Sequence, residues 1–268
     1  MAQSSAQRAA AAAFSEPLAA LQRRAAAAPA APPLRLSPAG FDIIAEIKLR
    51  SPAAGQLGSR NDDWLGRAVA YARGGAAAVS VLTEPSRFDG SLHHLERAAE
   101  ALRPLGVPAM RKDFLVDPYQ VAEARAAGAG GVLLIVRMLT PQRLQELLDA
   151  AARFGLFVLL EAFDGSDLAA AAQLLRGREQ QHPPVLIGIN SRDLQTLEVV
   201  QRRFESLAPL LPAGWPAVAE SGVASADDAT RMLHLGYRLA LIGTALMTCA
   251  DPAQLLRQIF EATRTVKT

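Results

Sequence analysis

From Phe41 onward, short apolar segments alternate with longer segments in which hydrophobic residues recur at helical spacing. The short segments are almost continuously hydrophobic, which is typical of strands buried on both faces of a parallel sheet. The residues expected at their C-terminal ends are Lys48, Leu82, Lys112, Ile135, Glu161, Asn190, Glu220 and Gly243. Successive ends lie 23 to 34 residues apart, which leaves room for one strand, one helix and two short loops.

Capping residues mark where the intervening helices begin and end. The signals are Asp117-Pro118, Thr140-Pro141, Asp251-Pro252 and the capping-box-like stretch from Ser225 to Asp228 for helix starts, and Gly128, Gly155 and Gly236 for helix ends. Eight successive strand–helix units of this size favour a closed (β/α)8 barrel, the TIM barrel, over an open sheet. No linker divides residues 41–268. The sequence therefore predicts an α/β fold with one barrel domain over residues 41–268.

Residues 1–40 have a different composition, rich in alanine and with a proline cluster at Pro29, Pro32 and Pro33. Leu18 to Ala28 contains good helix formers, and we expect it to form a helix that lies on the end of the barrel. The segment lacks the apolar core of a secretory signal. We interpret residues 1–40 as a partly helical N-terminal extension.

Composition and charge exclude several classes of protein. Half of the 268 residues are hydrophobic and a fifth are charged, as in ordinary globular enzymes. The 28 basic and 26 acidic residues nearly balance and form no basic run, so we expect no nucleic-acid partner. The apolar runs, such as Val132 to Val136, are too short to cross a bilayer, and the single Cys249 allows no disulfide framework. We therefore expect a soluble, cytoplasmic protein with no membrane partner.

Lysine is rare in this chain, and its positions are informative. Only Lys48, Lys112 and Lys267 are lysines, whereas the other 25 basic residues are arginines. Two of the three stand at expected strand ends, and a desolvated lysine, unlike an arginine, can give up its proton. This distribution predicts proton-transfer chemistry at Lys48 and Lys112. The alternative is two ordinary surface lysines.

Active sites of such barrels lie at the C-terminal ends of the strands, where this sequence gathers polar residues. Glu46 lies two positions before Lys48, so both side chains point to the same face. The expected group consists of Glu46, Lys48, Lys112, Glu161, Asn190 and Glu220, with Arg192 just beyond the sixth strand. Any one of them could be a satisfied buried group or a salt bridge at the rim. Six at matching positions predict a catalytic site.

A phosphate site is expected beside this group. Ser221-Gly222 and Gly243-Thr244 follow the seventh and eighth strands, where such barrels hold phosphate on backbone N–H groups and hydroxyls. Ser51 could add a hydroxyl and Lys48 a cation, although ordinary loop chemistry would explain the same residues. The four histidines lie away from the strand ends, and no dinucleotide or Walker pattern occurs. We expect acid–base work on a small phosphorylated molecule, with no cofactor and no metal.

The same residues stand in motifs that resemble those of the indole-3-glycerol phosphate synthase family, over about residues 41–257. The matching stretches are Ile44-Ala-Glu-Ile-Lys48 with Ser51-Pro52, Ser80-Val-Leu-Thr-Glu84 with Phe88-Asp-Gly-Ser91, Arg111-Lys-Asp-Phe114 with Asp117-Pro-Tyr-Gln120, Ile187-Gly-Ile-Asn-Ser-Arg-Asp-Leu194, Ala219-Glu-Ser-Gly222, and Leu241-Ile-Gly243 with Leu246-Met247. The resemblance implies a carboxy-lyase of tryptophan biosynthesis. Its reaction would be ring closure of 1-(2-carboxyphenylamino)-1-deoxyribulose 5-phosphate, with loss of carbon dioxide and water, to indole-3-glycerol phosphate. Other enzymes of that pathway are the protein partners it suggests.

The resemblance also implies roles for individual residues. The residue matching Lys112 is the general acid that protonates the substrate's carbonyl oxygen as the ring carbon attacks. Residues matching Glu46, Lys48 and Glu161 carry the remaining proton transfers and the dehydration, with their division left open. Asn190 and Glu220 complete the implied catalytic set.

Binding roles follow from the same resemblance. The residues matched to orientation of the anthranilate ring, its carboxylate and the sugar hydroxyls are Asn190, Arg192, Glu220 and Ser221. Those matched to phosphate binding are Ser51, Gly222, Gly243 and Thr244. Those matched to the apolar walls of the aromatic pocket are Phe88, Phe114, Leu133 and Leu194.

Departures from the family pattern leave alternatives open. Ala53-Ala54-Gly55 stands where the family commonly has Ser-Lys-Gly, Ala162-Phe163 stands where it has Val-His, and the N-terminal extension matches poorly. One alternative is a paralogue that acts on a substituted anthranilate analogue in a secondary pathway. An isomerase of a ribulosyl phosphate fits the Lys112 stretch and the strand-1 residues poorly. A non-catalytic phosphate-ligand-binding barrel would be expected to have lost part of the polar group.

Overall fold

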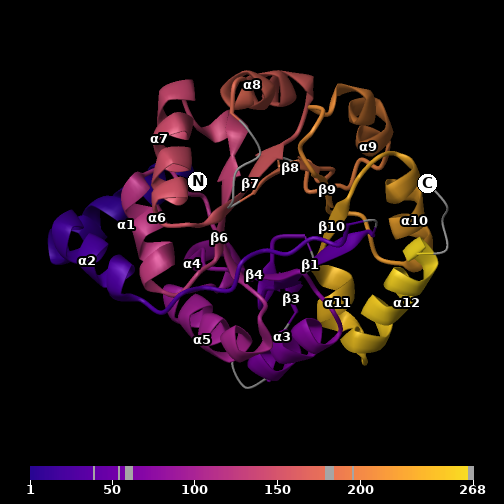
Figure 1. Ribbon diagram of the computed structural model, residues 1–268, viewed down its shortest axis with the longest axis horizontal. Coiled ribbons are helices and arrows are strands. Elements are labelled where there is room, and N and C mark those ends of the chain that lie inside the picture. The colour runs from indigo at the N-terminus through magenta and orange to yellow at the C-terminus, as the bar shows by residue number, and fades with distance from the viewer. Residues whose placement is uncertain (39, 54, 58–62, 179–183, 195, 265–268) are drawn as a thin grey trace.

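The computed structural model describes residues 1–38, 40–53, 55–57, 63–178, 184–194 and 196–264. Within these ranges, eight parallel strands close into a barrel, because the last strand pairs with the first (Figure 1). In barrel order they are β1 (Asp42–Ile47), β4 (Ala78–Leu82), β5 (Ala109–Lys112), β6 (Gly131–Ile135), β7 (Phe157–Ala162), β8 (Val185–Asn190), β9 (Ala217–Glu220) and β10 (Leu239–Ile242). A short antiparallel ribbon, β2 (Arg50–Ser51) and β3 (Gly55–Gln56), follows β1. The predicted (β/α)8 barrel is confirmed.

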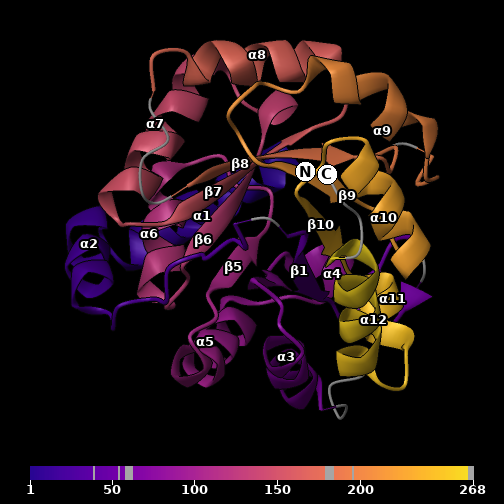
Figure 2. The same cartoon turned by 45° about the vertical axis from the view of Figure 1, so that its right-hand side comes forward.

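Helices connect the strands and cover the outside of the barrel (Figure 2). They are α3 (Trp64–Arg73), α4 (Pro85–Phe88), α5 (Leu92–Leu102), α6 (Pro118–Ala126), α7 (Pro141–Arg153), α8 (Gly165–Leu175), α9 (Arg202–Leu207), α10 (Ala226–His234), α11 (Thr244–Thr248) and α12 (Pro252–Arg264), with 3-10 turns η1 (Arg103–Leu105), η2 (Val136–Met138) and η3 (Ala208–Leu210). Asp117, Thr140 and Ser225 cap the helices that the sequence predicted to begin after them. Local capping chemistry thus fixes where these three helices start.

The barrel interior is filled by side chains from alternate strands. Ile44, Met110, Leu159 and Val218 stand on the first, third, fifth and seventh strands of the barrel and belong to one buried apolar cluster. Two positions further along the same strands, on the same face, come Glu46, Lys112, Glu161 and Glu220. The apolar filling therefore ends, toward the C-terminal mouth, in a layer of four ionisable side chains.

The N-terminal extension runs along the outside of the barrel. Its helices are α1 (Ala2–Ser15) and α2 (Leu18–Ala27), and α2 packs beside α6 (Figure 1). The helix predicted at Leu18 to Ala28 is therefore present, but its predicted position on the end of the barrel is wrong. Leu34, beyond the helices, joins the interior apolar cluster instead. The reason is that α2 finds its apolar partner on α6, around Tyr119 and Ala122.

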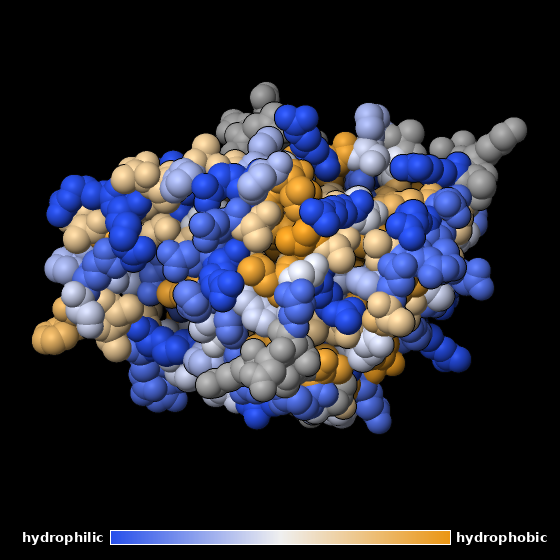
Figure 3. All heavy atoms as spheres, turned by 90° about the horizontal axis from the view of Figure 1, so that it is seen from below, coloured by the Kyte–Doolittle hydropathy of each residue, from blue (hydrophilic) through white to orange (hydrophobic). Residues whose placement is uncertain are grey.

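The surface seen in Figure 3 is mainly hydrophilic, and its hydrophobic side chains gather mostly near the middle of that face. Among the described residues, no helix combines the length and the apolar character needed to cross a membrane.

Candidate active site

A cavity of about 710 Å³ opens at the C-terminal ends of the barrel strands. The residues predicted for the site all line it, and they are Glu46, Lys48, Ser51, Phe88, Lys112, Phe114, Leu133, Glu161, Asn190, Arg192, Leu194, Glu220, Ser221, Gly222, Gly243 and Thr244. The fold thus brings together side chains from eight strand ends. Their individual roles stay predictions.

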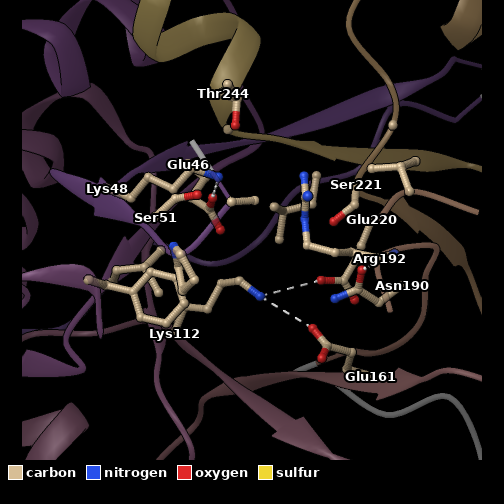
Figure 4. Close-up of a pocket in the computed structure, with 18 of the residues that line it drawn as sticks. Glu46, Lys48, Ser51, Lys112, Glu161, Asn190, Arg192, Glu220, Ser221 and Thr244 are labelled. Atoms are coloured by element: carbon tan, nitrogen blue, oxygen red, sulfur yellow. Dashed lines mark hydrogen bonds and ion pairs between the residues drawn. The ribbon is translucent and has the colours of Figure 1, made fainter. Parts of the chain in front are cut away.

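Lys112 lies between two carboxylates of the ionisable layer (Figure 4). Its Nζ is 3.2 Å from Glu161 Oε2 and 3.6 Å from Glu220 Oε2. Beside them, Lys48 Nζ donates to Glu46 Oε1 at 2.7 Å. The side chains of the three glutamates are almost completely buried, so the charges interact in a medium that screens them poorly.

The surroundings of Lys112 change the expectation from the sequence about its proton. Burial by itself would lower the pKa of its ammonium, but the carboxylates of Glu161, Glu220 and Glu46 outweigh burial and raise the pKa above its usual value. The sequence argument assumed that desolvation would release the proton of the Lys112 ammonium. In the structure desolvation does not release it, because the carboxylates outweigh it. Lys112 is a protonated donor in this site, and it needs a strongly basic acceptor to give the proton up.

The pKa values of the Glu46 and Glu220 carboxyl groups are shifted in opposite directions. Burial works to raise the pKa of Glu46, yet the charges of Lys48 and Lys112 hold it below its usual value. Burial and the neighbouring Glu161 charge raise the pKa of Glu220 well above its usual value, against the opposing charge of Lys112. Neither oxygen of Glu220 has a hydrogen-bond partner among the described residues. Divergent carboxyl pKa values within one cavity are typical of acid–base sites.

Two glycines, one within β8 and one directly after β10, make room for this layer. A Cβ at Gly188 on β8 would overlap Glu220 Oε1, and a Cβ at Gly243 would overlap Glu46 Oε1 and lie 2.7 Å from Lys48 Nζ. Gly243 was predicted from its place after the eighth strand, but for phosphate binding. Gly188 was not predicted, since one glycine within a strand carries no sign of what lies beside it.

The loops that follow β9 and β10 offer backbone groups beside this layer. Ser221 and Gly222 both have left-handed backbone, with φ of 65° and 89°. Thr244 begins α11 directly after Gly243. Ser51 is buried in β2. Free N–H groups at a helix start and in such a turn are suited to an anionic oxygen.

Apolar side chains from other strand ends form a slot in the same cavity. The rings of Phe88 and Phe114 lie 6.5 Å apart at an angle of 48°. Leu133 belongs to the interior apolar cluster, and Leu194 packs against it. Arg192, at the edge of the slot, donates through Nη1 to Leu197 O at 2.7 Å, and its backbone N–H donates to Asn190 Oδ1 at 2.9 Å.

A buried charge network next to the site was not predicted. Asp113, directly after Lys112, accepts from Arg8 Nη2 at 2.6 Å, from Thr83 Oγ1 at 2.9 Å and from Arg111 Nη2 at 3.2 Å. These charges hold the pKa of Asp113 below its usual value in spite of its burial. Asp113 stands in one of the sequence motifs, but nothing in the sequence pointed to Arg8, which is 105 residues away.

The histidines and the residues that depart from the family pattern lie as follows. His93 and His94 lie in α5 and His234 ends α10, whereas His182 lies outside the described residues. Ala53 lines the cavity, and Ala54 lies outside the described residues. Phe163 stands at the second departure from the family pattern. The guanidinium carbon Cζ of Arg137 lies 4.7 Å from the centroid of its ring.

Fold and site together define a class: a (β/α)8 barrel whose cavity joins a layer of ionisable side chains to an apolar slot and a glycine-containing turn. The model of the family described as indole-3-glycerol phosphate synthase matches residues 3–259. Relatives named indole-3-glycerol phosphate synthase include one from Nocardioides sp., 44% identical over 82% of this chain and 80% of that protein. Another, from Dehalococcoides mccartyi, is 39% identical over 91% of this chain and 92% of that protein. The chain therefore belongs to the indole-3-glycerol phosphate synthase family, and the predicted carboxy-lyase function in tryptophan biosynthesis is confirmed at this level.

Solved structures share the barrel with far less sequence similarity. 3-Hexulose-6-phosphate synthase from Salmonella typhimurium is 14% identical, with a TM-score of 0.60 over 84% of this chain and 99% of that one. Thiamine phosphate pyrophosphorylase from Pyrococcus furiosus is also 14% identical, with a TM-score of 0.59 over 84% of this chain and 96% of that one. At this identity the likeness shows the fold alone.

Proposed function

We propose that this cavity closes the ring of 1-(2-carboxyphenylamino)-1-deoxyribulose 5-phosphate, with loss of carbon dioxide and water, to give indole-3-glycerol phosphate. The observation that carries the proposal is the position of Lys112. Its ammonium lies within 3.2 Å of Glu161 and 3.6 Å of Glu220, in a buried layer on the floor of the cavity. An acid held there reaches a carbonyl that is anchored from both sides.

Lys112 acts as the general acid of the first step. The ring carbon that carries the carboxylate attacks the substrate's carbonyl carbon, and Lys112 gives its proton to the carbonyl oxygen. That oxygen becomes strongly basic as the new carbon–carbon bond forms, so even an ammonium whose pKa is raised can protonate it. Carbon dioxide then leaves with its bonding electrons returned to the ring. Neighbouring carboxylates stabilise the cationic ring that forms in between.

The second step removes the new hydroxyl group as water. It needs an acid for the leaving oxygen and a base for the proton lost from the ring. Glu161 lies next to Lys112, and Glu46 forms an ion pair with Lys48, so both kinds of group are within the layer. We assign the dehydration to these residues together, with Asn190 and Glu220 orienting the reacting atoms.

Two anchors bring the distant reacting carbons together. We assign the anthranilate ring to the slot of Phe88, Phe114, Leu133 and Leu194, and its carboxylate to Arg192 with Ser221 close by. We assign the phosphate to Ser51, Gly222, Gly243 and Thr244, across the cavity from the slot. A flexible substrate that is held at both ends has already lost much of its conformational freedom on binding. Less of the entropy cost of ring closure then remains for the chemical step.

The setting of the enzyme follows from the chemistry of its reactants. Substrate and product are both phosphorylated and do not cross membranes unaided, so we propose that the enzyme works in the cytoplasm beside other enzymes of the tryptophan pathway. We further propose that residues 1–40 serve the barrel of residues 41–268 as an extension and do not form a unit of their own.

A fluorescence assay for indole formation tests the proposal. Purified protein is mixed with the carboxyphenylamino-deoxyribulose phosphate without added metal or cofactor, and Lys112→Arg is compared with the unchanged chain. We expect turnover by the unchanged chain and a loss of about 10²- to 10⁴-fold in the variant, because arginine keeps the charge but does not release a proton usefully. Binding of inorganic phosphate should survive.

Other outcomes would redirect the assignment. Near-normal turnover of Lys112→Arg would contradict the general-acid role. Tight binding of the compound without turnover by the unchanged chain would favour a paralogue that acts on a substituted anthranilate analogue. Absence of both would leave only an anion-binding barrel.

A further inference from the structure

The turn after β9 is held, on its carbonyl side, by the described residues of the segment that follows β8, namely 191–194 and 196–201. Ser191 contributes two bonds, from its N–H to Glu220 O at 2.9 Å and from its Oγ to Ser221 O at 2.6 Å. Gln201 contributes a third, from Nε2 to Gly222 O at 2.9 Å. Three consecutive carbonyl groups of the turn therefore bind to one neighbouring segment.

These bonds determine where the N–H groups of the turn point. In a planar trans peptide the C=O and the N–H point in opposite directions. When the carbonyls of Ser221 and Gly222 face residues 191–201, the N–H groups of Gly222 and Val223 face the other way. Gly222 and Val223 line the cavity, and within the described residues neither N–H donates to another protein group. The turn thus presents two free donors to the cavity.

The turn would not keep this shape by itself. Ser221 has a left-handed backbone with φ of 65°, which is unfavourable for a residue with a Cβ and persists only where the surroundings hold it. At Gly222 the approach is close, because a Cβ there would lie 2.8 Å from Gln201 Nε2 and 2.9 Å from Val199 Cγ1. The side chains of Ser191 and Gln201 therefore help to maintain a backbone conformation that Ser221 by itself does not favour.

This segment is itself held by hydrogen bonds. It also contributes side chains to the apolar slot of the cavity. Val200 N–H donates to Ser191 O at 2.8 Å, and Arg203, just beyond, donates to Asn190 O at 2.7 Å. The same segment contributes Arg192 and Leu194 to the slot. Figure 4 shows Ser221 on the same side of the cavity as Asn190 and Arg192. One segment thus both holds the turn and contributes side chains to the slot.

We propose that Ser191 and Gln201 are positioning residues that act through the backbone of Ser221–Val223, aiming its free N–H groups at the substrate's phosphate. Both hold the turn from its carbonyl side, and of the two only Gln201 lines the cavity. The inference deepens the proposed function, since it takes from it the phosphate as the bound group. It adds Ser191 and Gln201, two residues to which the family resemblance gives no role.

The test compares Gln201→Leu and Ser191→Ala with Gln173→Leu, a surface control on α8. Two probes are titrated by calorimetry into each folded protein, inorganic phosphate for the turn and anthranilate for the slot. We expect Gln201→Leu and Ser191→Ala each to weaken phosphate binding about 3- to 10-fold, the effect of one hydrogen bond. KM should rise by a similar factor with little change in kcat, while anthranilate binding and the Gln173→Leu protein stay unchanged.

Each other outcome counts against the inference in a distinct way. Unchanged phosphate binding in both variants would overturn the positioning role and leave the proposed reaction intact. Equal weakening of phosphate and anthranilate binding would show a general structural defect and would also overturn it. Failure of the unchanged chain to bind phosphate at all would remove both the positioning role and the phosphate assignment of the proposed function.

Discussion

Charge balance among a few buried side chains decides what the cavity can do. Lys112 and Lys48 carry positive charge, and Glu46 and Glu161 can match it with two negative charges. A proton on Glu220, whose pKa is raised by burial and by Glu161, leaves this buried set neutral. A neutral set avoids the large cost of an uncompensated buried charge. It also leaves two proton donors on the floor of the cavity, the ammonium of Lys112 and the carboxyl group of Glu220.

Substitution of Gly188 by alanine should impair catalysis more than it impairs folding. The added Cβ would overlap Glu220 Oε1, so the carboxyl group must move away from Lys112. We expect kcat to fall by about 10²-fold, as small misplacements at reacting centres do, with a stability loss of about 1–3 kcal/mol from overpacking. Steady-state kinetics and urea denaturation measure the two effects.

Gly165→Ala is the matched control, because a Cβ there meets only Leu210 Cδ1 at 3.3 Å on the outside of the barrel. It should leave kcat unchanged. Equal kcat values for Gly188→Ala and the unchanged chain would show that the position of Glu220 does not matter for the reaction.

Sequence reasoning succeeds or fails at single residues for identifiable physical reasons. Lys112 and Glu161 could be predicted because a polar residue at the end of an apolar strand stands out against its neighbours. The raised pKa of Lys112 could not, because it depends on how close three carboxylates from other strands come. Gln201 could not either, since its importance arises from a carbonyl 21 residues away.

At the scale of elements, α1 is attached to the site by charge more than by apolar packing. Its sequence is mostly alanine, and Ala9 and Ser5 are its buried residues. Arg8 reaches Asp113 at 2.6 Å and Glu84 at 3.5 Å, in the loops after β5 and β4. An alanine-rich helix has little apolar area to bury, so a partly buried arginine with almost completely buried carboxylate partners supplies the specific contact.

Loss of Arg8 should therefore loosen α1. We expect Arg8→Ala to lower the free energy of unfolding by about 1–2 kcal/mol, because Asp113 loses one charged partner but keeps Arg111. Amide exchange of residues 2–15 should speed up. Urea denaturation and hydrogen–deuterium exchange measure the two quantities.

Arg24→Ala is the control, since Arg24 pairs with Glu16 on the surface and half of its side chain is exposed. It should change the free energy of unfolding by less than about 0.5 kcal/mol. If both variants behave alike, the contact of Arg8 with Asp113 contributes no more than an ordinary surface pair.

At the scale of the whole molecule, the fold was the most predictable feature and the extension the least. Regular spacing of apolar segments reports a repeated βα unit, and eight such units leave one closed arrangement. The path of α1 and α2 depends on partners such as Arg125, which donates to Ala28 O, and Tyr119, which donates to Glu16 O. Such contacts join residues about a hundred positions apart and leave no periodic signal.

The charge layer should also shape how the stability of the whole molecule depends on pH. The raised pKa of Glu220 means that, between its unfolded and folded pKa values, the native state binds more protons than the unfolded state. The free energy of unfolding therefore falls as pH rises through that window, by about 1.4 kcal/mol for each unit of elevation. Glu220→Gln cannot titrate and should lack this loss. Denaturation at pH 4 and pH 8 should show equal stabilities at the lower pH and a more stable variant at the higher one.

Glu96→Gln, which changes an exposed carboxylate on α5, should show no such gain. The opposite sign at pH 8, a less stable Glu220→Gln, would mean that Glu220 is ionised and bonded to Lys112 in the native state. The buried set would then carry a net negative charge before substrate binds, which would work against an anionic substrate. The sign of one stability difference thus decides between a neutral floor, ready for a substrate with two anionic groups, and a charged floor that must take up a proton when the substrate binds.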